Sequence, residues 1–190
     1  MTHAGKDPLA NMSAPQIIDT GRDLNALFTA QAKATPSAVA LQDISQSYTY
    51  SELDAKVSDL ALHLRRSHSV GRDVLVGVLL ERCSDYVVAC LAALRAGGAF
   101  LVLELAYPPT LLQDVIEDAQ PAVILTHTSH AKLIRAEVPT ISLDDASFQQ
   151  KLSSTGSAKG DADLPPLPAQ DDLERLAFVS YSSGTTGKPK

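Results

Sequence analysis

Residues 74–81, VLVGVLLE, decide the fold class of this 190-residue chain. The run is almost entirely apolar, which is typical of a strand covered on both faces in a parallel sheet. On its N-terminal side, residues 51–67 place leucine, valine and alanine on one face at helical spacing. We predict a helix there, with Ser51 as its N-cap and Asp54 at its third position. On the C-terminal side, residues 84–96 predict a second helix.

The alternation of apolar strands and amphipathic helices continues along the chain. Asp23 is placed to cap a short helix that ends before Pro36. Thr110 and Gln113 form a capping-box pattern ahead of a helix that Pro121 stops. This order predicts an α/β fold whose mostly parallel sheet is flanked by helices. The other predicted elements are strands at residues 38–43, 47–50, 99–104, 122–127, 140–145 and 176–182, and a short helix at residues 130–136.

Charge and composition exclude several classes of protein. A net charge of −6 argues against a nucleic-acid-binding surface, which needs clustered Lys and Arg. The longest apolar region, residues 86–107, is interrupted by Arg95 and Glu104, so we expect no membrane-spanning helix and no membrane partner. The N-terminus lacks the apolar core of a secretory signal, and Cys83 and Cys90 are too few for a disulfide framework. A cytoplasmic protein is therefore expected.

Composition also suggests how the chain is divided. Residues 1–22 are polar and aperiodic, so we expect a mobile N-terminal tail. Residues 23–190 are expected to form one domain. Within it, residues 153–172, SSTGSAKGDADLPPLPAQDD, are rich in turn-forming residues and are predicted to be an exposed loop.

The chain ends in residues 181–190, YSSGTTGKPK, directly after the last predicted strand. Glycines let the backbone approach an anion closely, and successive N–H groups and hydroxyls can donate to it. Lys188 adds positive charge suited to phosphate oxygens. These features are typical of a loop that binds nucleotide phosphates. It is not a Walker loop, because only two residues separate Gly184 from Gly187 and Pro189 follows the lysine.

With two earlier segments, this loop resembles the AMP-forming adenylate-forming enzymes, which include acyl-CoA synthetases, luciferases and the adenylation domains of nonribosomal peptide synthetases. The stretch LAFVSYSSGTTGKPK (176–190) looks like the family's phosphate loop. YTYSELDAKVSDLALHLR (48–65) and LRAGGAFLVLELAYPP (94–109) are similar to the first and second core motifs of adenylation domains. Residues 100–105, FLVLEL, depart from the family pattern, which has two prolines and an aspartate there, and this leaves the subfamily open.

The resemblance implies a fold, a reaction and a set of binding residues. The fold would be the first part of the N-terminal domain of the adenylate-forming enzymes, so that residues 23–190 are a partial AMP-binding domain. The complete enzyme would use ATP and Mg²⁺ to convert a carboxylic acid, often an amino acid, to an acyl adenylate. The acyl group would then pass to a phosphopantetheine thiol on a carrier-protein domain. The residues implied to bind the β- and γ-phosphates of ATP are Ser182, Ser183, Gly184, Thr185, Thr186, Gly187, Lys188 and Lys190.

The family's adenine, acyl and catalytic-lysine motifs have no counterpart in this sequence. We therefore expect no catalytic residue in this chain and no adenylation by the chain alone. A truncation would account for a chain that ends inside its own phosphate loop. Two alternatives stay open: a non-catalytic interaction or regulatory remnant of such a domain, and part of a single-module carboxylate reductase.

The remaining polar clusters favour structural roles. His127 and His130 have no cysteine or carboxylate at zinc spacing and indicate a polar turn after a strand, so no metal site is expected. His63 and His68 lie on or just past an amphipathic helix and are expected to be solvated. The acidic pairs at residues 144–145 and 171–172 are expected to be solvated loop charges.

Overall fold

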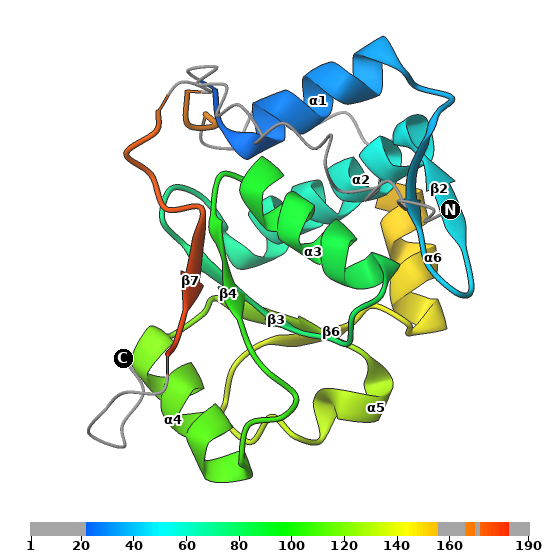
Figure 1. Cartoon of the computed structure of the whole chain (residues 1–190). Helices are drawn as coiled ribbons and strands as arrows, with labels where there is room; N and C mark the ends of the chain where they lie inside the picture. Colours follow the sequence, from blue (N-terminus) through cyan, green and yellow to red (C-terminus); the bar gives the residue numbers. More distant parts are fainter. Residues whose placement is uncertain (1–21, 156–165, 170–171, 183–190) are drawn as a thin grey trace, which may run out of the picture.

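The central element of the fold is a five-stranded parallel sheet (Figure 1). The computed structural model describes residues 22–155, 166–169 and 172–182. The strand order is β6-β5-β3-β4-β7, and an antiparallel hairpin, β1-β2, lies apart from this sheet. The strands are β1 (Val39–Gln42), β2 (Ser47–Thr49), β3 (Leu75–Leu79), β4 (Ala99–Val102), β5 (Val123–Thr126), β6 (Thr140–Ser142) and β7 (Phe178–Ser180).

Helices cover both faces of this sheet (Figure 1), which confirms the predicted fold class. One face carries α2 (Tyr50–His68) and α3 (Ser84–Arg95), against which α1 (Leu24–Ala34) packs; α6 (Ala146–Thr155) contacts α2. The other face carries α4 (Pro109–Ala119) and α5 (Thr128–Ala131). None of the helices in the described ranges is long and apolar enough to cross a membrane.

Strand β3 lies in the middle of the sheet and is buried on both faces. Val76 and Val78 belong to the hydrophobic cluster that includes α2 and α3, whereas Leu79 belongs to the cluster that includes α4. All three side chains have 0% exposure. The two-sided burial predicted from residues 74–81 is therefore confirmed, and the regular strand is the shorter Leu75–Leu79.

The start of α2 differs from the predicted one, whereas the start of α1 agrees with it. Helix α2 is capped by Thr49, which forms a reciprocal capping box with Glu52, and not by Ser51. Thr49 has the extended backbone that an N-cap requires, so Ser51 is already inside the first turn. At α1 the prediction is confirmed, because the Asp23 carboxylate accepts a hydrogen bond from the Ala26 N–H at 2.7 Å.

The capping box predicted for Thr110 and Gln113 is wrong. Helix α4 has Pro108 at its N-cap and a proline in its first turn, where the absent N–H is not needed. The Gln113 side chain instead links α4 to the segment before β6. It donates to the Leu133 carbonyl at 3.1 Å and accepts from the Arg135 N–H at 2.9 Å.

The segment around β6 also departs from prediction. Helix α5 spans Thr128–Ala131 and not residues 130–136, and α6 continues to Thr155, three residues into the predicted loop. His63, expected to be solvated, is only 9% exposed. Its ring packs edge-on against Phe148 of α6 at 5.2 Å, and burial lowers the pKa of His63. No helix was predicted at α6, so the contact that buries His63 was not predicted either.

The α3–β4 junction requires glycine for two reasons. Gly97 has a φ of 90°, a conformation that glycine adopts without steric cost. At Gly98, a Cβ atom would lie 2.6 Å from the Val74 carbonyl oxygen and 2.7 Å from Val70 Cγ1. The missing side chain thus allows β4 to start directly beside β3.

Candidate functional site

The candidate site lies where β7 leaves the sheet. Because all five strands are parallel, their carboxyl ends meet at one edge, which is where open α/β sheets bind ligands. Strand β7 pairs with β4 through three residues, and Ser182 follows it after a single intervening tyrosine. The strand that precedes the predicted phosphate loop therefore points the chain towards the ligand-binding edge.

Tyr181, the residue between β7 and Ser182, is tied to other elements by both its backbone and its side chain. Its carbonyl oxygen accepts a hydrogen bond from the Tyr107 hydroxyl at 3.4 Å, and its own hydroxyl donates to the Asp118 carboxylate of α4. Burial, together with the hydrogen bond and the charge of Asp118, raises the pKa of Tyr181 to about 12. These contacts fix the direction in which the chain enters the loop.

Strand β7 needs such anchors because it is the outermost strand of the sheet and pairs with β4 on one side. Phe178 is 58% exposed, although its ring stacks on Phe100 of β4 with centroids 5.6 Å apart. At its start, the Leu176 N–H donates to the Asp73 carboxylate at 2.8 Å. The Phe100 ring and the Asp73 carboxylate therefore supplement the pairing with β4 near the start of β7.

Of the predicted phosphate-binding residues, Ser182 is described and lies exposed at the end of β7. Its position agrees with a loop that leaves the carboxyl edge. The role assigned to it stays a prediction. The other predicted residues lie outside the described ones: Ser183, Gly184, Thr185, Thr186, Gly187, Lys188 and Lys190.

A second polar cluster lies at the carboxyl ends of β3 and β5. His127 Nε2 is 3.0 Å from the Asp85 carboxylate, and His130 Nε2 is 2.9 Å from the Glu81 carboxylate. Both pairs join the segment after β5 to the segment after β3, and the Thr126 hydroxyl donates to the Leu79 carbonyl below them at 2.8 Å. The sequence indicated a polar turn here but not the carboxylates, which lie more than 40 residues away.

These pairs do not form a metal site. Within the part of the chain that the structure describes, no group of three or more His, Cys, Asp or Glu side chains could hold a metal ion. Asp144 is exposed, as predicted, and it accepts hydrogen bonds from the Thr128 N–H and hydroxyl at 2.7 and 3.0 Å. Hydrogen bonds from the Ser147 hydroxyl and the Phe148 N–H lower the pKa of Asp145. Both carboxylates therefore accept backbone hydrogen bonds and stabilise the segments near β6.

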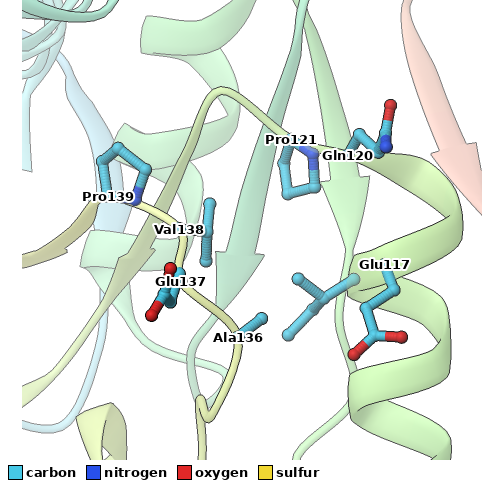
Figure 2. A pocket seen from close by; sticks show the side chains of 8 residues that line it. Glu117, Gln120, Pro121, Ala136, Glu137, Val138 and Pro139 are labelled. Atoms are coloured by element: carbon cyan, nitrogen blue, oxygen red, sulfur yellow. The ribbon is translucent and has the colours of Figure 1, made fainter.

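A surface hollow of about 430 Å³ lies at the opposite edge of the sheet (Figure 2). Two of the residues that line it lie just before the amino ends of strands: Pro121 is two residues before β5, and Pro139 is directly before β6. It is therefore separate from the exit of β7. Its lining residues are Ile116, Glu117, Gln120, Pro121, Ala136, Glu137, Val138 and Pro139.

Comparison with known proteins shows which family the chain resembles. The family model described as "AMP-binding enzyme" matches residues 28–190. The chain is 61% identical over 175 residues to "Glycine betaine reductase ATRR" of Emericella nidulans, a match that covers 92% of this chain and 13% of that protein.

Two solved structures show the same arrangement of elements. VinN in complex with 3-methylaspartate matches with a TM-score of 0.74 at 27% identity, covering 87% of this chain and 45% of that one. The nonribosomal peptide synthetase FmoA3, in its α-methyl-L-serine-AMP bound form, matches with a TM-score of 0.66 at 25% identity, covering 84% and 17%. The chain thus spans less than half the length of each of these relatives.

Proposed function

Because the chain belongs to the AMP-binding family of adenylate-forming enzymes, we propose that it supplies the phosphate-binding part of an adenylation site. In this reaction a carboxylate oxygen attacks the α-phosphorus of ATP, and the bond to the bridging oxygen of the β-phosphate breaks. The products are an acyl adenylate and pyrophosphate. The observation that carries the proposal is that the loop sequence starts where a parallel strand, β7, ends at the ligand-binding edge.

The chemistry of the loop residues fits the triphosphate. Ser182, Ser183, Thr185 and Thr186 offer hydroxyl donors, the glycines allow close approach of the backbone, and Lys188 and Lys190 offer positive charge. Their proposed work is to position the nucleotide and to stabilise the charge on the departing pyrophosphate. Bound Mg²⁺ would offset the negative charge of the phosphate oxygens.

The acid is proposed to be an amino acid or a close derivative of one. The solved relatives are bound to 3-methylaspartate and to the adenylate of α-methyl-L-serine, and the reductase relative is named for glycine betaine. A phosphopantetheine thiol on a carrier domain is the proposed acceptor of the acyl group. ATP, the acid and this carrier are thus the proposed partners.

A second candidate is that the chain forms part of a carboxylate reductase that activates glycine betaine. The 61% identity to the reductase favours this candidate over a peptide synthetase. Both candidates share the adenylation step and differ in the fate of the acyl group. A reductase releases an aldehyde once a reductant is supplied, whereas a peptide synthetase passes the acyl group to an amine.

The decisive experiment places the chain in the context of a longer relative. A chimera is built in which this chain replaces the matching segment of glycine betaine reductase ATRR, and ATP–pyrophosphate exchange is measured with glycine betaine. We expect the chimera to catalyse exchange, and Lys188→Ala to lower kcat/KM for ATP by about tenfold or more. Lys33→Ala removes the same charge from an exposed position at the end of α1 and serves as the matched control.

A folded chimera with no exchange, under conditions where the parent reductase is active, would contradict the proposal. Equal losses from Lys188→Ala and Lys33→Ala would show that the loop lysine has no special role.

A further inference from the structure

A buried guanidinium lies beside the segment that leads into β7. The Arg175 side chain is only 7% exposed, and its Nη2 donates to the Asp23 carboxylate, which also caps α1. Its Nε and Nη1 atoms are buried and have no hydrogen-bond partner among the described residues. Buried donors are satisfied in the great majority of cases, so these two call for an acceptor.

Space for an acceptor lies next to Arg175. Two adjoining hollows of about 130 and 60 Å³ are both lined by Arg175 and Asp23. The rim of the larger hollow is apolar, and three of its leucines are unusually exposed: Leu24 at 55%, Leu173 at 56% and Leu176 at 44%. A buried cation surrounded by exposed leucines matches a segment that carries an acceptor next to apolar side chains.

We propose that this surface binds residues 17–19 of the same chain, Ile-Ile-Asp. These residues lie outside the described part of the structure, which begins at Arg22. Asp19 is four residues before Asp23, so its Cα can lie anywhere within about 14 Å of that of Asp23, the residue that Arg175 contacts. The hollow is thus within reach without any rearrangement of α1.

The chemistry of the segment complements the surface. The Asp19 carboxylate accepts from one open donor of Arg175, and a backbone carbonyl of the segment accepts from the other. Ile17 and Ile18 cover the leucines on the rim. Asp172, the other carboxylate in the larger hollow, forms an ion pair with Arg72, so Arg175 with its two open donors is the group that attracts a further acceptor. The proposal is independent of the reaction.

Thermal unfolding of the full chain and of four variants tests this docking. Asp19→Ala is expected to lower the Tm by roughly 2–6 °C, whereas Asp7→Ala, which removes the same charge earlier in the tail, leaves it unchanged. Deletion of residues 1–20 is expected to lower the Tm at least as much as Asp19→Ala, and deletion of residues 1–13 to leave it unchanged. A synthetic peptide of residues 14–21 is expected to restore the Tm of the longer deletion.

Hydrogen exchange gives a second measurement that needs no variant. The amides of residues 17–19 are expected to exchange more slowly in the wild-type chain than those of residues 3–9. Equal exchange in both stretches, or equal Tm values for the two deletions, would overturn the proposal. A Tm that rises with protein concentration and is insensitive to Asp19→Ala would also overturn it, because a second copy of the chain would then cover the leucines.

Discussion

Arg95, at the end of α3, joins three helices through one side chain. Its Nη1 donates to the Asp54 carbonyl at 3.0 Å and to the Ser58 hydroxyl at 2.7 Å, and its Nη2 donates to the Asp54 carboxylate at 2.7 Å. Towards α1, its Nε donates to the Asn25 side chain at 3.1 Å, and its guanidinium lies 5.4 Å from the Phe28 ring centroid. We predict that Arg95→Met is one of the most destabilising single changes on this face of the sheet.

The magnitude follows from burial. Arg95 is 14% exposed, so its hydrogen bonds are mostly shielded from water, and bonds from a charged donor contribute about 1.5–3 kcal/mol each. Several partners can rehydrate, and the contributions are not additive, which leaves an expected loss of about 2–4 kcal/mol. Asp54 is 37% exposed, so the ion pair alone contributes below about 1 kcal/mol. Asp54→Ala should therefore cost much less than Arg95→Met.

Urea unfolding measures both variants and the double variant. An exposed arginine, Arg82→Met, serves as the control and should be neutral. For a domain of this size the loss at Arg95 corresponds to a Tm lowered by about 4–16 °C. A loss below about 1 kcal/mol for Arg95→Met would refute the proposed link between the helices. Equal losses for Arg95→Met and Asp54→Ala would show that the ion pair, and not the set of helix-linking hydrogen bonds, carries the effect.

Three further predictions concern the loop anchor, a tight junction and a buried thiol. In the reductase chimera, Tyr181→Phe should raise the KM for ATP about 3–10-fold, because it removes the hydroxyl that donates to Asp118; unchanged KM values would separate this tyrosine from phosphate binding. Gly98→Ala should cost about 1–3 kcal/mol in urea unfolding, because of its close approach to a carbonyl, whereas Gly71→Ala, with open space around it, should not. Burial raises the pKa of Cys90 to about 12, so the folded state holds the proton more tightly than the unfolded state. Stability should then fall as pH rises from about 9 to 12 in a Cys83→Ser background, and a flat profile would contradict this burial.

The periodic segments could be predicted because each carries its own signal. The two-sided burial of β3 and the buried stripe of α2 follow from local spacing alone. The strand order could not be predicted in this way. The apolar pattern of a strand does not show which strands pair with it, and β3 lies between β4 and β5. Helix starts were harder, since Thr49 and Ser51 are both good caps and only the extended backbone at Thr49 decides between them.

The part of the candidate site that has a local sequence pattern was predicted, and its long-range contacts were not. The composition of the loop from Ser182 onwards points to phosphate, but nothing local to it reveals Tyr107, which is 74 residues away in sequence. The partners of His127 and His130 were missed likewise, because long-range pairs leave no periodic pattern. The buried position of His63 depends on Phe148 of α6, which lies 85 residues away in sequence and for which no helix was predicted.

The direction in which the chain leaves β7 depends on α4 as much as on the sheet. Strand β7 has only three residues and pairs with one neighbour, β4. Fewer backbone hydrogen bonds therefore hold β7 than hold β3, which pairs with a strand on each side. The Asp118 carboxylate, on the last turn of α4, accepts from the tyrosine at that end. Helix α4 is in turn held to the sheet by Val115, which is fully buried. A change that shifts α4 along the sheet should therefore move Tyr181 and Ser182, although Asp118 and Tyr181 are 63 residues apart in sequence.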